Sequence, residues 1–247
     1  MNFYHPLAYI YDEVISLFCV FYKKNILLYL ILVVIIFSGM LICNFYMNSI
    51  VANVTPNLII IDPGHGGEDG GAIGITGAPE KELNLSIALK LKEKLLNTGF
   101  NVIITRSDDK MLGAENITKN KKRNDLKERV KIAKKNENAL FISIHMNHFD
   151  DTKQKGSQVF YSKNNPNSKK LAELIDKNLK EGLDPNNKRE IKKAGSEIYI
   201  LNKIENPACL IECGFISNPG EEQKLMSESY QWKITDMIIN GICEFFY

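Results

Sequence analysis

The sequence has little of several features that mark common protein classes. Its 31 basic and 29 acidic residues nearly cancel to a net charge of +2, which is too even a balance to indicate a nucleic-acid-binding protein. Its five cysteines are an odd number and include no C-x-x-C pair, so neither a zinc ribbon nor a disulfide framework is expected. It contains no G-x-x-x-x-G-K-[ST] motif, which argues against nucleotide binding, and no H-E-x-x-H motif of the kind that many zinc peptidases share.

Charged residues are also absent from one long stretch near the N-terminus. Residues 26–43 include none, and the apolar character continues weakly to Met47. At 1.5 Å per residue, this run is about long enough to cross a hydrocarbon core of roughly 30 Å. A cleavable signal peptide usually has a shorter apolar region and a small-residue cleavage site, and NSIVANV at residues 48–54 offers only a weak one. The pattern therefore favours an uncleaved transmembrane anchor.

The basic residues around this apolar run predict its orientation. Lys23 and Lys24 precede it, and the next basic residue is Lys81, so the positive-inside rule places the N-terminal segment in the cytoplasm. The remainder of the chain then lies outside the cytoplasm. The predicted organisation has four parts: a cytoplasmic segment at residues 1–22, a signal anchor at 23–47, a linker at 48–56 and one folded domain at 57–247.

Short apolar runs and amphipathic segments alternate along the folded domain. Strands are expected at residues 58–61, 100–105, 139–144, 158–161, 198–201 and 208–213. Helices are expected at residues 82–97, 125–136, 166–181 and 230–246. This alternation predicts an α/β fold with a mostly parallel sheet of about six strands flanked by helices. The polar, aperiodic segment at residues 107–124 does not fit the pattern, and we interpret it as a functional or mobile loop.

Histidines follow two of the expected strands. His65 lies in the glycine-rich stretch IDPGHGGEDGG after the first strand, and His145 and His148 follow the strand FISI. A single histidine is more often structural, but open α/β sheets bind ligands at the carboxyl ends of their strands, where these residues would meet. Catalytic zinc sites take three protein ligands, usually imidazoles and carboxylates. The candidates for a carboxylate third ligand are Glu68, Asp69, Glu80 and Glu82.

One further acid lies inside an apolar run. The stretch CLIECGF places Glu212 within an expected strand. A buried carboxylate is costly unless it is paired or bound to a metal. Glu212 is therefore either half of a buried ion pair or a carboxylate whose raised pKa lets it act as a general base.

Four blocks of this sequence, in order, resemble the zinc-dependent N-acetylmuramoyl-L-alanine amidases of the type-3 family. They are IIIDPGHGGEDGGAIG with His65, EKELNLSIALKL with Glu80, FISIHMN with His145 and LIECGFISN with Glu212. The resemblance implies a twisted sheet between helices, one Zn²⁺ held by His65, Glu80 and His145, and Glu212 as the catalytic residue. The implied reaction is hydrolysis of the amide between N-acetylmuramic acid and L-alanine in peptidoglycan. His148 aligns with no ligand.

A narrower resemblance concerns the subgroup. The segment TKNKKRNDLKERVKIA at residues 118–133, together with the single anchor and the lack of wall-binding repeats, is similar to the CwlD-type amidases of spore formers. This resemblance implies action on spore-cortex peptidoglycan, as a step toward muramic-δ-lactam and germination. It also implies a place in the forespore or spore membrane, facing the cortex. Some relatives of this type need a partner protein, and the sequence leaves open whether this chain needs one in the spore envelope.

Three residues are candidates for contacts with the substrate. Arg106 and Arg129 could hold a carboxylate of the stem peptide, although positions on the surface or on a helix face explain them equally well, and Asn147 follows His145 closely enough to contact substrate. Two other functions stay open: a peptidoglycan-binding protein of the same fold with weak catalysis, and a zinc peptidase that cuts within the stem peptide.

Overall fold

The computed structural model describes residues 13–16, 25–26, 28–43, 57–113 and 119–247. The chain separates into two compact units, Met1–Thr55 and Pro56–Tyr247. In the first unit, residues 28–43 are helical and their large apolar side chains are exposed. Within the described residues, no helix combines the length and the apolarity needed to cross a membrane. Most of the predicted cytoplasmic segment and the whole of the predicted linker lie outside the described residues.

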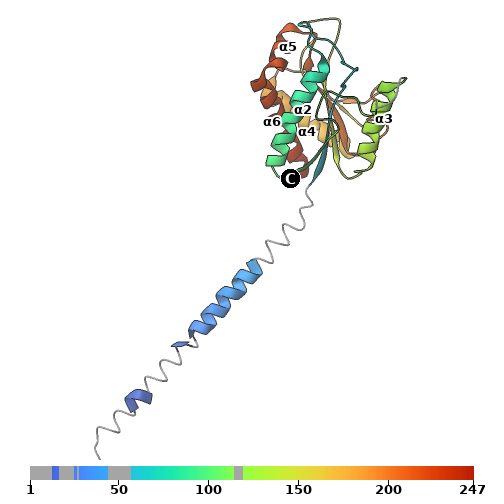
Figure 1. The fold of residues 1–247 in the computed structure, drawn as a ribbon. Coiled ribbons are helices and arrows are strands. Elements are labelled where there is room, and N and C mark those ends of the chain that lie inside the picture. Colours follow the sequence, from blue (N-terminus) through green and yellow to red (C-terminus); the bar gives the residue numbers. More distant parts are fainter. Residues whose placement is uncertain (1–12, 17–24, 27, 44–56, 114–118) are drawn as a thin grey trace, which may run out of the picture. The chain divides into compact units, whose positions relative to one another are not determined.

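The second unit is built on a six-stranded sheet (Figure 1). Its strands are β1 (Leu58–Pro63), β2 (Asn101–Ile104), β3 (Leu140–Asn147), β4 (Gln158–Tyr161), β5 (Lys192–Lys193) and β6 (Ala208–Phe215). The strand order is β2-β1-β3-β6-β4-β5. All neighbouring strands run parallel except β4 and β6, which are antiparallel. The predicted α/β fold with a mostly parallel sheet is confirmed.

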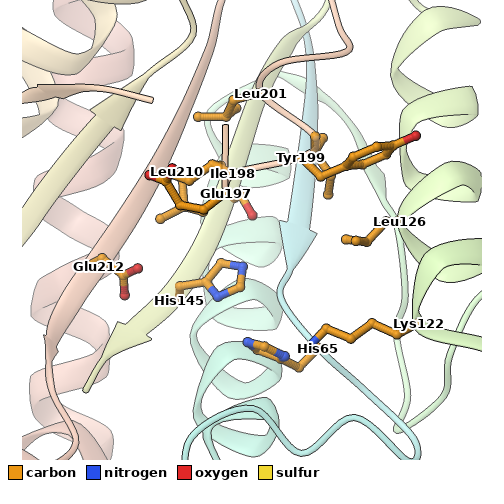
Figure 2. Close-up of a pocket in the computed structure, with 12 residues that line it drawn as sticks. His65, Lys122, Leu126, His145, Glu197, Ile198, Tyr199, Leu201, Leu210 and Glu212 are labelled. Atoms are coloured by element: carbon orange, nitrogen blue, oxygen red, sulfur yellow. The ribbon is translucent and has the colours of Figure 1, made fainter. Parts of the chain in front are cut away.

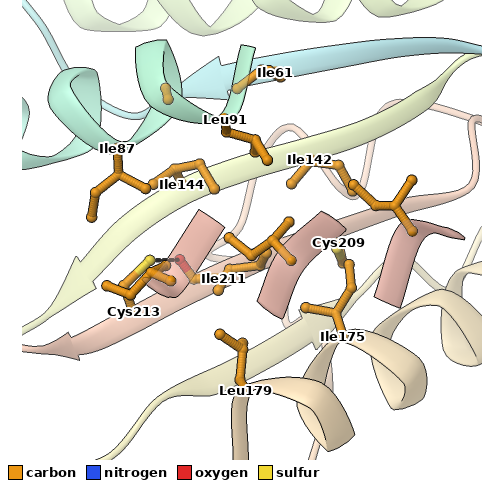
Figure 3. Packing of buried hydrophobic residues seen from close by; sticks show 14 of the residues in the cluster. Ile61, Ile87, Leu91, Ile142, Ile144, Ile175, Leu179, Cys209, Ile211 and Cys213 are labelled. Atoms are coloured by element: carbon orange, nitrogen blue, oxygen red, sulfur yellow. Dashed lines mark hydrogen bonds between the residues drawn. The ribbon is translucent and has the colours of Figure 1, made fainter. Parts of the chain in front are cut away.

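Helices cover both faces of this sheet. They are α2 (Glu80–Asn97), α3 (Lys121–Lys134), α4 (Asn167–Leu183), α5 (Pro219–Met226) and α6 (Glu228–Phe246). Helices α2, α4 and α6 lie on one face, and α3 lies on the other (Figure 1). The side chains of β1 alternate accordingly, with Ile59 and Ile61 in the first core and Ile60 in the second. Figure 3 shows the first core, where Ile142 of β3 and Ile211 of β6 pack between α2 and α4.

The strand predicted at residues 198–201 is wrong. This segment forms turns, and the strand that pairs with β4 is β5 instead. Ile200 and Leu201 are nonetheless buried in the second core, and the carbonyl of Leu201 accepts a hydrogen bond from Ser162 Oγ at 2.7 Å. The apolar run suggested a strand because strands are often buried. Here the run is buried by side-chain packing, without pairing to another strand.

One helix boundary and one whole helix also differ from the prediction. Helix α3 begins at Lys121, so the end of the supposed loop is helical, and helix α5 was not predicted. The sequence signal for α5 is its N-terminal cap. The side chain of Asn218 accepts hydrogen bonds from the backbone amides of Gly220 and Glu221, and Pro219 occupies the first turn.

The packing of α4 against α6 gives a test of the fold. A Cβ at Gly241 would lie 2.7 Å from Cα of Ile175, which is backbone and cannot move aside. We expect Gly241→Ala to lower the free energy of unfolding by about 1–3 kcal/mol, measured by denaturant titration. Gly220→Ala is the control, since its Cβ meets only Asn218 Oδ1 at 3.5 Å and alanine favours a helix. Equal midpoints for the two variants would contradict this packing.

Candidate metal centre

Three side chains from separate elements converge at the carboxyl edge of the sheet. His65 follows β1, Glu80 is the first residue of α2 and His145 lies near the end of β3. One possible ligand atom from each lies within 4.8 Å of the others. His65 Nε2 is 3.2 Å from Glu80 Oε2, and His145 Nδ1 is 2.9 Å from Glu80 Oε1. Figure 2 shows both imidazoles directed into one space beside Glu212.

Glycine is required where the chain passes these side chains. A Cβ at Gly64 would lie 2.2 Å from the imidazole of His145. At Gly71, where φ is +70°, a Cβ would lie 2.6 Å from Glu80 Oε2. The glycine-rich stretch therefore brings the backbone against two of the three converging side chains, as only a residue without Cβ can.

Two buried arginines fix the backbone that carries His65. Arg129 donates to the carbonyls of Pro63 and His65 at 2.6 and 2.7 Å, and Arg106 donates to those of Pro63 and Gly64 at 3.1 and 2.8 Å. Each arginine is only 1% exposed. Their donors serve three consecutive carbonyls within the protein, and the expected contact with a stem-peptide carboxylate stays a prediction.

Acidic side chains balance the charge of Arg129. Asp62 and Asp125 lie 2.7 and 2.8 Å from its guanidinium, and both are buried. Burial alone would raise the pKa of Asp62, but Arg129 and hydrogen bonds from Thr105 and Ser143 hold that pKa below its usual value. Asp62 therefore stays ionised beneath the site and keeps the arginine paired.

Carboxylates also surround His65. Its Nδ1 contacts Asp69 Oδ2 at 2.9 Å, which leaves Nε2 facing Glu80. Burial lowers the pKa of His65, but the two carboxylates outweigh burial and raise that pKa to about 9. Burial would raise the pKa of Glu80, but its contacts with His145 and His65 hold that pKa far below its usual range. Positive charge is stabilised here, and a metal cation would compete with protons for these atoms.

The carboxylate candidates for a third ligand separate clearly in the structure. Only Glu80 contacts both histidines. Asp69 instead contacts the far nitrogen of His65 and pairs with Lys122 at 3.1 Å, a role that the sequence analysis did not assign to it. Such a carboxylate behind a ligating imidazole orients the ring. The remaining candidates face away, since Glu68 pairs with Lys121 and Glu82 is exposed. An imidazole–carboxylate–imidazole donor set of this kind fits Zn²⁺.

Glu212 lies beside His145, directly opposite it in the β3–β6 pairing. Its Oε2 is inaccessible to solvent and receives no hydrogen bond. Burial raises the pKa of Glu212 to about 7, although His145 lowers it. No lysine or arginine of the described residues forms an ion pair with it, so the alternative of a structural ion pair finds no support.

A cavity of about 280 Å³ opens onto these groups. His65, His145 and Glu212 line one side, and Ile198, Tyr199 and other residues of the 197–201 turn segment line another (Figure 2). This wall was not predicted, because the apolar run at residues 198–201 suggests a strand. His148 is exposed beyond the end of β3, and Asn147 lines a second hollow instead.

The comparisons with known proteins agree on one family. The sequence profile of the N-acetylmuramoyl-L-alanine amidases matches residues 59–244. Over 191 residues, the chain is 37% identical to the germination-specific N-acetylmuramoyl-L-alanine amidase of Bacillus subtilis, covering 76% of this chain and 79% of the relative. The CwlD amidase of Clostridioides difficile, solved in complex with the GerS lipoprotein, is 41% identical with a TM-score of 0.74, covering 77% and 98%. The amidase AmiC2 of Nostoc punctiforme is 30% identical with a TM-score of 0.67, covering 77% and 97%.

The three converging side chains are tested by metal affinity. We expect His65→Ala, Glu80→Ala and His145→Ala each to weaken Zn²⁺ binding by about 100-fold or more, above the 10–100-fold typical of losing an outer partner. Competition with a zinc-binding dye measures the effect. His148→Ala is the control and should bind Zn²⁺ almost as the parent does, because the side chain is exposed outside the cluster. A loss of Zn²⁺ affinity in His148→Ala equal to that in His145→Ala would contradict the choice of His145 over His148.

Proposed function

The chain belongs to the N-acetylmuramoyl-L-alanine amidase family, and on that premise we propose that it is a zinc-dependent enzyme of spore-cortex peptidoglycan. The bond it hydrolyses is the amide between the lactyl carboxyl of N-acetylmuramic acid and L-alanine. The observation that best supports this assignment is the placement of Glu212, an unpaired buried carboxylate, beside the donor set of His65, Glu80 and His145.

The residues divide the chemistry between them. In the proposed mechanism, His65, Glu80 and His145 would hold one Zn²⁺, which would polarise the scissile carbonyl and lower the pKa of the attacking water. Glu212 accepts a proton from the attacking water on its carboxylate. As the carbon–nitrogen bond breaks, Glu212 delivers this proton to the amine of L-alanine. A pKa of about 7 suits both transfers near neutral pH.

The spore cortex is proposed as the substrate because of the relatives. A Bacillus subtilis relative is named for its germination-specific activity, and the CwlD amidase shares 41% identity over nearly its whole length. We therefore place the reaction before muramic-δ-lactam formation. Nothing favours the alternatives of a weakly catalytic binding protein or a peptidase within the stem peptide. Since the CwlD amidase was solved with a lipoprotein, we also propose that this chain works with a protein partner in the spore envelope.

We further propose that the N-terminal unit anchors the enzyme. Residues 28–43 form a helix whose large apolar side chains are exposed, from 46% at Leu32 to 66% at Tyr29. An exposed apolar surface of this extent needs a partner, and lipid satisfies a helix that is apolar all round. The uncharged run extends over residues 26–43 and follows Lys23 and Lys24, so the proposed anchor orients the amidase domain outward, toward the cortex.

The proposed function is tested by Glu212→Gln, which keeps the shape but cannot accept the proton. Mass spectrometry of digested cortex peptidoglycan should find free N-terminal L-alanine for the parent. The variant should cleave about 10²–10⁴-fold more slowly, with near-parental zinc content. Products cut within the stem peptide would overturn the bond assignment. Near-parental cleavage with a lowered melting temperature would make Glu212 structural.

The anchor is tested by fractionation of spore-forming cells. We expect the full chain in the membrane fraction, with its amidase domain open to protease added from the outer side of that membrane. A chain of residues 53–247 is the control and should be soluble, because it lacks the apolar run. Recovery of the full chain in the cytosol would contradict the proposed anchor.

A further inference from the structure

A second hollow lies next to Glu212 on the same face of the sheet. Its volume is about 320 Å³, and Asn147, Gln158, Arg189 and Lys192 are among its lining residues. Gln158 of β4 stands directly opposite Glu212 of β6, and Asn147 is two residues past His145 on β3. Residues two apart on a strand share a face, so this hollow continues the surface that presents the site.

Arg189 is held in a fixed orientation at this hollow. Its Nε donates to the carbonyl of Lys155 at 2.8 Å, and its Nη2 donates to Gln154 Oε1 at 2.6 Å. The guanidinium carbon lies 4.4 Å from the centre of the Phe215 ring. Nη1 has only a long contact of 3.5 Å with Gln158 Oε1, so it keeps donors for a ligand.

Positive charge in this hollow is not neutralised by the protein. Among the described residues, neither Arg189 nor Lys192 forms an ion pair with a carboxylate. A guanidinium immobilised by three contacts loses little entropy on binding and suits a planar carboxylate. The chemistry of the hollow thus points to an anionic group.

The position of the hollow matches the peptide side of the substrate. Opposed residues on antiparallel strands have Cβ atoms about 5 Å apart, so Arg189, beyond Gln158, is about two side chains from Glu212. An extended peptide advances about 3.3–3.6 Å per residue. A carboxylate two or three residues past the scissile amide would therefore reach Nη1 when the amide lies at Glu212.

We propose that Arg189 and Lys192 form a subsite for a free carboxylate of the stem peptide, on the peptide side of the scissile amide. This inference rests on the proposed amidase function. It proposes for Arg189 the contact that was predicted for Arg106 and Arg129. Of the four arginines in the chain, those two are buried and Arg123 is exposed on α3, which leaves Arg189.

The test compares two synthetic muramyl peptides that differ only in a free carboxylate or a carboxamide at the second peptide residue. A charge-assisted hydrogen bond of about 1.5–3 kcal/mol predicts that the full-length parent cleaves the acid with a kcat/KM about 10–100-fold higher, mostly through KM. Arg189→Gln should remove this preference by slowing only the acid. Lys192→Gln should reduce it in part. Lys193→Gln is the matched control, an exposed neighbour on the same short strand that does not line the hollow, and should keep the full preference.

The outcomes separate the subsite from the reaction. Equal rates on acid and amide by the parent would overturn the subsite and leave the amidase function standing, and this result needs no variant to fold. An equal slowing of both peptides by a folded Arg189→Gln would also overturn it. If the parent alone cleaves neither peptide, the reaction without the proposed partner protein is contradicted. Calorimetric binding of the two peptides to Glu212→Gln then decides the subsite: tighter binding of the acid supports it and equal binding overturns it.

Discussion

The geometry of the site depends on the hydrogen bonds from Arg106 and Arg129 to the backbone that follows β1. The carbonyls of Pro63, Gly64 and His65 leave the regular sheet there, and buried carbonyls without partners are costly. His65 also has a φ of 60°, which non-glycine residues adopt rarely. Removing one member of a buried ion pair typically costs about 3–5 kcal/mol. The buried, paired guanidinium of Arg129 is therefore strongly held in place, and it fixes the carbonyls that accept its hydrogen bonds.

The same stretch of backbone positions Glu80. The amide of Glu80 donates to the carbonyl of Ala72 at 2.8 Å, and Glu80 Oε2 accepts from the amide of Ala72 at 2.9 Å. Its other oxygen accepts from the amide of Met146 at 3.1 Å. A carboxylate in the first turn of α2 also interacts favourably with the helix dipole. One glycine-rich stretch therefore orients His65 directly and, through α2, the carboxylate between the two histidines.

Local signals in the sequence predicted His65, His145 and Glu212, whereas Glu80 was chosen among four acidic candidates only by the family resemblance. His65, His145 and Glu212 end or interrupt apolar runs, and the parallel sheet brings such positions to one edge. The roles of the arginines were not predictable in this way. Arg129 pairs with Asp62 across 67 residues of chain, and a single sequence gives no sign that two such charges meet in a core. The segment at residues 198–201 failed for a related reason, since an apolar run reports burial and not hydrogen-bonded pairing.

Glu212 differs from the paired acids buried near it. The buried charges of Asp62, Asp125 and Arg129 are all paired, whereas one oxygen of Glu212 receives no hydrogen bond from the protein. Burial raises the pKa of this carboxylate to about 7, so its ionised form is held against the cost of desolvation. An unpaired carboxylate does not stabilise a protein core, but it can act as a proton acceptor at a site that substrate reaches. The cavity bounded by the 197–201 turns lies on one side of it and the hollow with Arg189 on the other, so a substrate that spans both must place a bond beside this carboxylate.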